Sequence, residues 1–281
     1  MRKYYLEGGV SGAVYNADDN HWDLIGRVMR MYIVSNPLHA TEFAPVTQME
    51  AEILRMCVKL YKGNSESCGL MTSGGTESII LSILSYREQA KAERGVKHPN
   101  IVVSHTVHAA FAKACYYFNI EYREVHQTSD CKFNLYGVSK LIDSNTICLV
   151  ASAPDYAFGN FDPVPEVAAL ALKHGIGCHV DSCLGSFVNI FAERAGYRLP
   201  CKFDFTVPGV TSISTDPHKY GYAPKGVSIA LFKNPELRNY SFFNITTWTG
   251  GMYGTPTIAG SRPGNVIAGT WAALMSIGQE Q

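Results

Sequence analysis

The sequence has no excess of either charge: 24 basic and 24 acidic residues give a formal net charge of zero. Basic residues are not clustered in any one stretch either. Proteins that bind nucleic acids or anionic membranes through charge carry a basic patch or stripe. The charge pattern therefore excludes these as general partners and favours a specific small molecule as the ligand.

Long apolar runs are also missing. No run approaches the roughly 18 residues that are needed to cross a bilayer. Residues 1–5 carry no apolar segment of the kind found in secretory signal peptides. With 46% hydrophobic residues in 281 positions, we expect a soluble, cytoplasmic protein with one large core.

Paired cysteine motifs are absent although eight cysteines are present. None forms a Cys-x-x-Cys pair, and several lie within apolar stretches such as residues 146–150. We therefore expect reduced, buried thiols and neither disulfides nor a zinc site. His105 and His108 have the types of two metal ligands, but no third ligand follows at a suitable spacing. We expect no metal ion at this pair.

Segments typical of strands alternate with helical segments through most of the chain. Strands are expected at residues 101–104, 121–125, 147–152, 176–180, 210–214 and 227–232. Helices are expected at residues 22–32, 48–61, 108–118, 138–143, 165–174 and 265–278, with another between the glycine turn at 69–78 and Gly95. This alternation predicts an α/β fold with a mostly parallel sheet flanked by helices.

Residues 1–45 are rich in Gly, Asn and aromatic residues and lack clean periodicity, which predicts an irregular N-terminal arm. The main domain then covers residues 46–281. Its last helix has an apolar face that is formed by Ile267, Trp271, Leu274 and Met275. Because an apolar face needs a partner, we expect a further C-terminal segment that is absent from this sequence.

A polar turn after the expected strand 210–214 contains His218 and Lys219. Tyr220 and Tyr222 flank this lysine on the other side. Desolvation among these groups would lower the pKa of the Lys219 amine and make it a nucleophile that can form a Schiff base with an aldehyde. The alternative is a solvated loop lysine, so Lys219 needs partners elsewhere in the chain.

Two other segments offer such partners. Residues 73–76 form a glycine turn at a helix start, where backbone N–H groups and the helix dipole favour a phosphate. Asp181 ends an expected strand and should face the ligand crevice, where it can pair with a protonated ring nitrogen. The alternatives are a plain turn at residues 73–76 and a helix N-cap at Asp181.

Two histidines complete the set. His108 follows another strand end and is a candidate for stacking on a planar cofactor, with a capping or core role as the alternative. His179 lies on the same side of its strand as Asp181, with a buried structural role as the alternative. A phosphate cradle, a ring partner, a ring-nitrogen partner and an aldehyde-binding lysine together match what pyridoxal 5'-phosphate needs.

Several longer blocks resemble one family. They cover residues 10–15, 35–39, 72–78, 179–185, 211–226 and 256–264. These blocks resemble the sphingosine-1-phosphate lyase family, relatives of the pyridoxal phosphate-dependent group II decarboxylases. The resemblance implies the large domain of a fold type I enzyme that cleaves the C2–C3 bond of sphingoid base 1-phosphates. A long-chain aldehyde and phosphoethanolamine are then the products.

The same resemblance assigns roles to single residues. Lys219 binds the cofactor as a Schiff base, Asp181 pairs with the pyridine nitrogen and His108 stacks on the ring. The other residues placed at the cofactor are Gly75, Thr76, His179, His218, Gly251 and Ser261. Gly251 and Ser261 are expected to reach across from the second subunit of a homodimer with shared active sites. The residues placed around the substrate are Tyr15, Asn36, His39, Tyr156, Lys225 and, with a catalytic role, Tyr253.

Some points differ from the family or stay open. Pro217 stands where the lyases commonly have threonine, and Asp-Pro-His-Lys is similar to the decarboxylase pattern. The resemblance also implies an N-terminal anchor at the endoplasmic reticulum membrane and a small C-terminal domain, neither of which is in this sequence. The base that removes the substrate proton is Lys219, a tyrosine or the substrate phosphate. An amino acid decarboxylase and a truncated non-catalytic homologue are the alternative functions.

Overall fold

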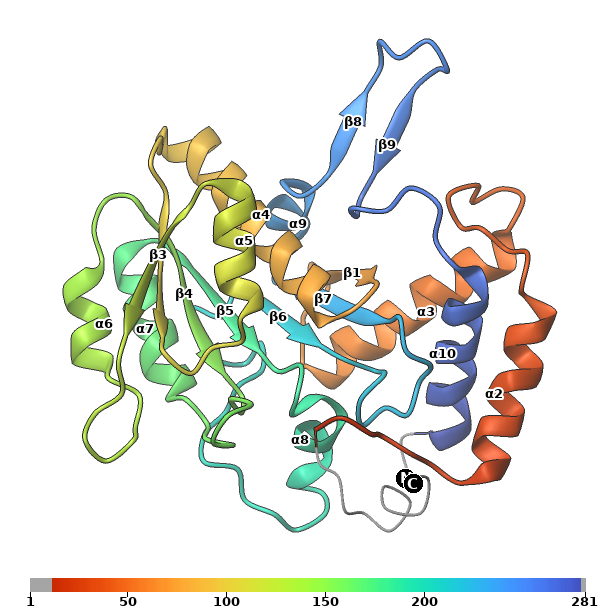
Figure 1. Ribbon diagram of the computed structural model, residues 1–281, viewed down its shortest axis with the longest axis horizontal. Helices are drawn as coiled ribbons and strands as arrows, with labels where there is room; N and C mark the ends of the chain where they lie inside the picture. The colour runs from red at the N-terminus through yellow and green to blue at the C-terminus, as the bar shows by residue number, and fades with distance from the viewer. Residues whose placement is uncertain (1–11, 279–281) are drawn as a thin grey trace.

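A seven-stranded sheet forms the centre of the computed structural model, which describes residues 12–278 (Figure 1). Its strands are ordered β1 (Cys68–Thr72), β7 (Ser228–Phe232), β6 (Ser212–Thr215), β5 (Gly177–Asp181), β4 (Thr146–Ser152), β2 (Asn100–Ser104) and β3 (Glu121–Val125). β6, β5, β4, β2 and β3 are parallel, and β7 runs antiparallel between β6 and β1. Every strand except β7 therefore has its carboxyl end at the same edge of the sheet.

Helices cover both faces of this sheet (Figure 1). One apolar cluster joins the sheet to α4 (Gly75–Arg94) and α5 (Ala110–Phe118), and a second joins its other face to α3 (Ala44–Leu60), α6 (Leu135–Leu141) and α7 (Val164–His174). On β2, Val102 belongs to one cluster and its neighbours Ile101 and Val103 belong to the other. This alternation is the period-2 pattern of a strand that is buried on both faces. The expected mixed α/β fold is confirmed.

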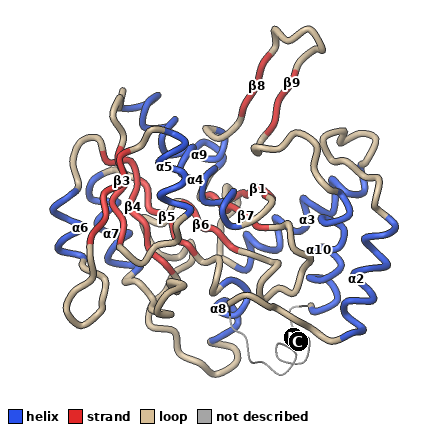
Figure 2. The backbone as a smooth tube through the Cα atoms, viewed as in Figure 1, coloured by secondary structure: helices blue, strands red, loops and turns tan. Residues whose placement is uncertain are grey.

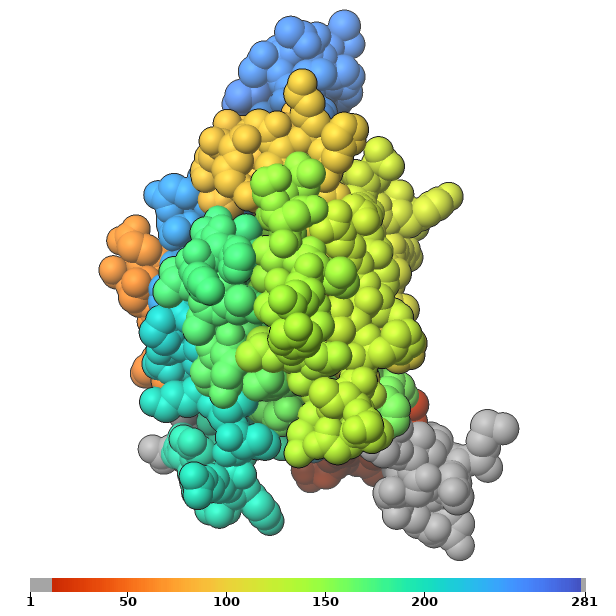
Figure 3. All heavy atoms as spheres, turned by 90° about the vertical axis from the view of Figure 1, so that its left-hand side faces the viewer, coloured from red at the N-terminus to blue at the C-terminus, as the bar shows by residue number. Residues whose placement is uncertain are grey.

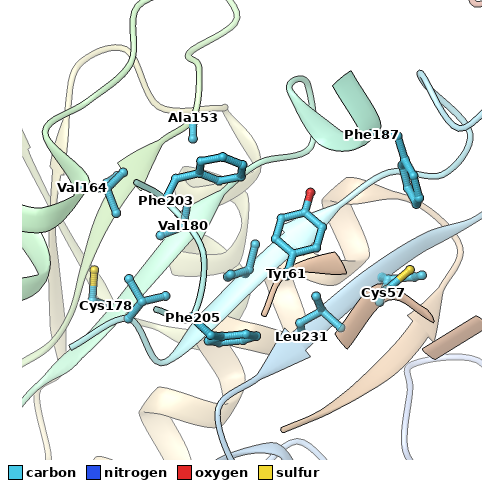
Figure 4. Packing of buried hydrophobic residues seen from close by; sticks show 14 of the residues in the cluster. Cys57, Tyr61, Ala153, Val164, Cys178, Val180, Phe187, Phe203, Phe205 and Leu231 are labelled. Carbon is cyan, nitrogen blue, oxygen red and sulfur yellow. The ribbon is translucent and has the colours of Figure 1, made fainter. Parts of the chain in front are cut away.

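Tyr61 links the core to the strand that precedes the Lys219 turn. Its ring is fully buried, and Figure 4 shows it among Phe203, Leu231 and Cys57. Burying an aromatic side chain of this kind contributes about 1.5–3 kcal/mol. The Tyr61 hydroxyl lies 2.7 Å from Thr215 Oγ1 at the end of β6. The core therefore anchors the backbone immediately before Asp216.

The last helix, α10 (Gly264–Ile277), packs against α2 (Asp19–Met31) and α3 (Figure 1). A Cβ at Gly269 would come within 2.8 Å of the Met29 side chain, so glycine lets α2 approach closely. Trp271 Nε1 donates to Glu52 Oε2 at 2.7 Å. The N-terminal arm and α3 thus cover part of the apolar face of this helix, while Met275 stays 52% exposed. The expected further C-terminal segment stays a prediction.

A two-stranded hairpin projects from the body of the protein (Figures 1 and 2). It pairs β8 (Phe243–Ile245) with β9 (Tyr253–Thr255) in antiparallel register. Figure 3 shows it at the top of the molecule, beyond the atoms of the sheet and its helices. The sequence did not predict this hairpin, nor the short helices α8 (Ser186–Ala192) and α9 (Pro235–Asn239) with these bounds, nor strand β1. Within residues 12–278, no helix has the length and apolar character of a membrane span.

Candidate functional site

The Lys219 turn follows β6 at the edge where the parallel strands end. Lys219 N donates to Asp216 O at 3.0 Å, and Tyr222 N donates to Lys219 O at 3.1 Å. Ser186 fixes Asp216 from the side, because its hydroxyl donates to Asp216 O at 2.8 Å and accepts from Asp216 N at 3.0 Å. In an open parallel sheet, this edge is where ligands bind.

The Lys219 amine forms an ion pair with a buried carboxylate. Its Nζ lies 3.0 Å from Asp216 Oδ2, and the Asp216 side chain is only 2% exposed. Burial by itself would lower the pKa of Lys219, but the negative charge of Asp216 outweighs it and raises that pKa. The expectation of a lowered lysine pKa is therefore wrong for the chain alone, because Asp216 was not among the partners predicted for Lys219.

His218 shares the same carboxylate. Its Nε2 lies 3.6 Å from Asp216 Oδ2, and burial lowers the pKa of the imidazole against the opposing effect of that carboxylate. At neutral pH the ring is therefore uncharged, with one N–H donor and one acceptor nitrogen. A neutral imidazole can donate to an anion or accept from a hydroxyl without adding charge to the site.

The start of α4 lies against this group. A Cβ at Gly75 would come within 2.9 Å of both Asp216 Oδ2 and Cys183 Sγ, so only glycine fits. The N–H groups of Gly75 and Thr76 lie in the first turn, where a helix provides no acceptor for them. Ser73 is different: its N–H and hydroxyl donate to Glu77 Oε2 at 2.7 and 2.6 Å. Of the expected cradle, Gly75 and Thr76 retain backbone donors for an anion.

Asp181 ends β5, and two donors hold it by one oxygen. Cys183 N and Ser214 Oγ donate to Asp181 Oδ1 at 3.0 and 3.1 Å. The N-cap alternative is wrong, since α8 begins at Ser186 with Gly185 as its N-cap. Asp181 is therefore a buried carboxylate at a strand end with a fixed orientation.

His179 is buried behind Asp181 and acts through Ser214. Burial lowers the pKa of His179 to about 4, so its ring is neutral. Its Nε2 lies 3.1 Å from Ser214 Oγ and its Nδ1 lies 2.7 Å from Ser212 Oγ, which in turn lies 2.6 Å from Tyr86 OH. Because Ser214 donates to Asp181, the His179 proton must sit on Nε2 and Ser212 must donate to Nδ1. A chain of hydrogen bonds thus runs from α4 to Asp181, and His179 is a positioning residue in it.

His108 lies at the carboxyl end of β2 and precedes α5. Its Nδ1 accepts from Ala110 N at 3.1 Å, so the capping alternative describes this contact. The side chain is nevertheless exposed at the ligand edge of the sheet. The hydrogen bond fixes one ring nitrogen and leaves the ring face for a planar ligand.

The N-terminal arm brings Tyr15 to the Lys219 turn. The Tyr15 ring packs edge-on against Tyr220 at 5.0 Å between centroids, and Lys225 Nζ lies 4.4 Å from the Tyr15 centroid. Lys225 Nζ also donates to His218 O at 2.6 Å. Tyr156 lies nearby, since a Cβ at Gly12 would come within 2.9 Å of its ring. These predicted substrate residues lie together although they come from distant segments.

Three buried polar atoms among the described residues have no hydrogen-bond partner: Tyr15 OH, Asp216 Oδ1 and His218 Nδ1. All three belong to the group around Lys219. Buried polar atoms in folded proteins are almost always paired, so an unpaired cluster needs a ligand to satisfy it. The adjoining helix start with its free donors fits a phosphate, and Lys219 fits an aldehyde. The residues present therefore fit pyridoxal phosphate.

A model of the pyridoxal-dependent decarboxylase conserved domain matches residues 13–281. The chain belongs to the pyridoxal-dependent decarboxylase family. Among curated relatives, sphingosine-1-phosphate lyase 1 of Rattus norvegicus is 47% identical over 279 residues, which cover 99% of this chain and 49% of the relative. The chain thus spans about half the length of the curated relatives it matches.

Solved structures of decarboxylase-family members agree with this assignment. A sphingosine-1-phosphate lyase of Burkholderia pseudomallei superimposes with a TM-score of 0.93 at 37% identity, over 96% of this chain and 64% of that one. A glutamate decarboxylase of Lactobacillus brevis gives a TM-score of 0.80 at 23% identity, over 94% of this chain and 62% of that one. The second likeness shows the shared fold alone.

Some residues predicted for the site of this decarboxylase-family chain lie on the hairpin instead. Gly251 is exposed between β8 and β9, and Tyr253 begins β9. The Tyr253 ring packs edge-on against Trp248 at 5.9 Å between centroids. The hairpin points away from the body (Figure 1), so these two residues do not join the Lys219 group within one chain.

Asn36, Ser261 and His39 form another separate set. Asn36 Nδ2 donates to Ser261 Oγ at 3.0 Å, while Asn36 Oδ1 accepts from Arg262 N at 3.2 Å. Both segments flank the start of α10, where Gly264 N donates to Ser35 O at 2.9 Å. His39 is exposed in the turn between α2 and α3. These predicted residues are near one another and remain predictions as ligand contacts.

Sequence reasoning missed the two residues that orient the charged groups, Asp216 and Ser214. The signal for Asp216 was its position three residues before Lys219, the spacing that closes a turn. Ser214 gave a weaker signal, as a polar residue inside an apolar strand. Pro217 is buried, and its carbonyl accepts from Ala223 N at 3.1 Å. Its effect on cofactor binding stays a prediction.

Proposed function

We propose that this chain forms the cofactor-binding part of a lyase that cleaves the C2–C3 bond of sphingoid base 1-phosphates with pyridoxal phosphate. The products are a long-chain aldehyde and phosphoethanolamine. The observation that carries the proposal is the cluster of unpaired buried polar atoms around Lys219. The rat and bacterial proteins to which the chain is similar are sphingosine-1-phosphate lyases.

The surroundings of Lys225 support a phosphorylated substrate with an apolar chain. Two cationic side chains, Lys219 and Lys225, lie near the buried Tyr15 hydroxyl, and burial together with the charge of Lys219 lowers the pKa of Lys225. A phosphate would relieve that repulsion. Beside them lies an open groove of about 480 Å³ with Tyr156, Leu184, Val188 and Tyr220 in its walls. This pairing of an anion site with an apolar groove matches a phosphorylated lipid and not a free amino acid.

The residues of the chain divide the chemical work. Pyridoxal phosphate, when bound, supplies an electron sink for the pair left at C2 as the bond breaks. Lys219 provides the amine for covalent attachment, and Asp216 Oδ2, 3.0 Å from Nζ, holds that amine in place. Asp181 presents a fixed carboxylate to a protonated ring nitrogen. Gly75, Thr76 and His218 offer donors to the cofactor phosphate.

Tyr15 acts as a hydrogen-bond donor in this proposal. Burial raises the pKa of its hydroxyl, so the group keeps its proton at neutral pH. The base that removes the C3 hydroxyl proton stays open among Lys219, a tyrosine such as Tyr253, and the substrate phosphate. A phosphate held by Lys225 and Tyr15 would also orient the C2–C3 bond relative to the cofactor ring.

A homodimer with shared active sites completes the proposal. Gly251 and Tyr253 lie on the hairpin, which points away from the body (Figure 1), and this is the arrangement expected if they serve a second copy. Ser261, which accepts a hydrogen bond from Asn36, is expected to serve the second copy as well. Placement at the endoplasmic reticulum membrane stays a prediction that rests on the family resemblance.

Absorbance of the purified chain with added pyridoxal phosphate tests the assignment of Lys219. We expect a band in the visible near-violet from covalently attached cofactor, lost in Lys219→Ala and retained in Lys225→Ala. The reverse pattern would mean that Lys225 binds the cofactor. Absence of the band from the unaltered chain would favour a non-catalytic homologue.

The substrate is tested on the same preparation. Release of a long-chain aldehyde from a sphingoid base 1-phosphate supports the lyase, and Lys225→Ala should raise KM more than it lowers kcat. Release of carbon dioxide from an amino acid, with no aldehyde from the phosphorylated lipid, would establish a decarboxylase instead.

A further inference from the structure

His105, Glu124 and His126 meet at the carboxyl ends of β2 and β3. Glu124 and His126 are two residues apart on the edge strand, so their side chains leave it on the same face. His105 follows β2, and its N–H donates to Val125 O at 2.9 Å, which fixes it beside this pair. Strand β3 is at the edge of the sheet, on the side of the molecule that Figure 3 faces.

The three side chains offer the ligands of a divalent transition metal. His105 Nδ1 lies 2.7 Å from Glu124 Oε1. The ring centroids of His105 and His126 are 4.6 Å apart, with an angle of 32° between the ring planes. One ligand atom of each of the three residues lies within 4.8 Å of the other two. Two imidazoles and one carboxylate are a common donor set for such ions. We propose that His105, Glu124 and His126 bind a divalent transition metal ion, with Zn²⁺ as the reference ion and water completing its shell.

The geometry requires only small side-chain movements. Tetrahedral Zn²⁺ with bonds of 2.0–2.1 Å sets its ligand atoms about 3.3 Å apart. All three side chains are exposed, so rotation about their own torsions can close the difference while the strands stay in place. The Ser104–Val125 register of the parallel pair holds the backbone in position. Tyr122 OH, 3.5 Å from Glu124 Oε2, can orient the carboxylate from outside the ligand set.

This site differs from the pair that the sequence indicates. The sequence sets His105 beside His108, but His108 turns its Nδ1 to Ala110 N and caps α5. The two further ligands come from a neighbouring strand and not from the next turn of chain. An ion here would brace the turn between β2 and His108, and the proposal does not depend on the lyase activity.

Calorimetric titration of the chain with Zn²⁺, in a Cys131→Ser background, tests the proposal. This substitution removes the exposed thiol that could compete for the ion. We expect one equivalent to bind, with affinity reduced at least about tenfold in His126→Ala and in Glu124→Gln. Co²⁺ in place of Zn²⁺ should give visible absorption that these variants lose. The melting temperature should rise with Zn²⁺ only while the three ligands are present.

His174→Ala is the matched control, since His174 is an exposed histidine at the end of helix α7 and not at the ends of β2 and β3. It should bind Zn²⁺ as the parent does. Because all substituted residues are exposed, circular dichroism should confirm that each variant folds. His105→Asn is a third variant that independently removes one of the proposed ligands. Zn²⁺ binding that is unchanged in all three ligand variants, or no binding by the parent, would overturn the proposal.

Discussion

The Lys219 pocket, formed by Tyr15, Asp216, His218 and Lys219, and the β8–β9 hairpin lack opposite kinds of partner. The pocket buries polar atoms that lack hydrogen-bond partners, namely Tyr15 OH, Asp216 Oδ1 and His218 Nδ1. The hairpin exposes large apolar side chains: Trp248 is 54% exposed and Met252 is 84% exposed. Unpaired buried polar groups call for a small polar ligand, while exposed apolar groups call for a protein surface. The two regions therefore require different partners.

This difference bears on how the predicted site residues are divided between two copies of the chain. The residues proposed to bind the cofactor assemble within one chain, around Lys219. Gly251 and Tyr253 lie on the projecting hairpin (Figure 2). The residues at its base, Asn244, Gly254 and Thr255, border a groove with α3 and β1 and not the Lys219 group. A second copy can satisfy both deficits at once if its hairpin lies over the pocket of the first. In a two-fold symmetric dimer each pocket would then receive one hairpin.

Mixing inactive variants gives the largest expected effect. Lys219→Ala disables the pocket and Tyr253→Ala disables the hairpin, so each variant alone should lose lyase activity. When the two are unfolded and refolded together, half of the dimers contain one intact site, and about one quarter of the parent activity should return. Aldehyde release from a sphingoid base 1-phosphate measures this recovery.

The matched control for this experiment mixes Lys219→Ala with Lys225→Ala. Both residues belong to the same pocket, as the hydrogen bond from Lys225 to His218 O indicates. No dimer of these variants contains an intact site, so the mixture should not exceed Lys225→Ala alone. Failure of the first mixture to recover activity would show that Tyr253 serves its own chain or none.

The pocket was more predictable from sequence than the hairpin for a physical reason. Strands buried on both faces and helices with glycine stops leave strong local patterns, so β4 begins one residue from its predicted start and α4 ends at Gly95 as predicted. The hairpin is short, exposed and rich in Thr and Gly, and such a segment has no apolar periodicity. Its direction depends on contacts beyond its own sequence.

Pairings between distant segments of the chain also limited what could be predicted from the sequence. The ion pair of Lys219 with Asp216 required the three-dimensional turn, and the chain from Tyr86 to Asp181 required the order of the strands. The packing of the N-terminal arm against α10 was not predicted, because about 240 positions separate the two segments in the chain. Local pattern therefore located the chemistry, while its supporting contacts came from strand pairing and helix packing.

Removing the His179 imidazole should have an intermediate effect and sharpens the account of the pocket. The substitution should be made as His179→Leu, because the amide of glutamine could still donate to Ser214; leucine removes the Nε2–H that holds Ser214, and so loosens Asp181 without touching the ligand edge. One hydrogen bond is worth about 1 kcal/mol, which predicts a kcat lowered roughly fivefold to tenfold. KM should change little, and the pH dependence of the cofactor absorbance should shift, because Asp181 acts on the ring nitrogen.

Two further variants separate this positioning role from simple destabilisation. Ser214→Ala should reproduce the shifted pH dependence, since it removes the direct donor to Asp181. Tyr86→Phe, at the far end of the chain, should lower the free energy of unfolding with a smaller shift. Equal loss of stability in all three variants with an unchanged pH dependence would mean that His179 is only a core residue.

The smallest effect on activity is expected for Asp162→Asn, on a second buried carboxyl near the same strand ends. Burial raises the pKa of Asp162 to about 7, with Asp155 and Asp181 adding to the shift against a hydrogen bond from Ser152 N. The unfolded chain releases this proton near the ordinary aspartate pKa of 3.8. Between these two values the folded protein binds more protons, so this group's contribution to the free energy of unfolding falls as pH rises through that window.

Asp162→Asn should therefore remove this fall, leave kcat unchanged and keep the bond to Ser152 N through its amide oxygen. Urea unfolding between about pH 2 and pH 8 measures the difference. Asp143→Asn gives the opposite sign as a control, because hydrogen bonds from Asn100 and Arg123 outweigh burial and lower the pKa of Asp143 to about 2. Its stabilising contribution is present above about pH 4 and is lost as pH falls towards 2. Parallel pH profiles for the two variants would show that Asp162 is ionised in the folded protein and that the strand ends tolerate two buried charges side by side.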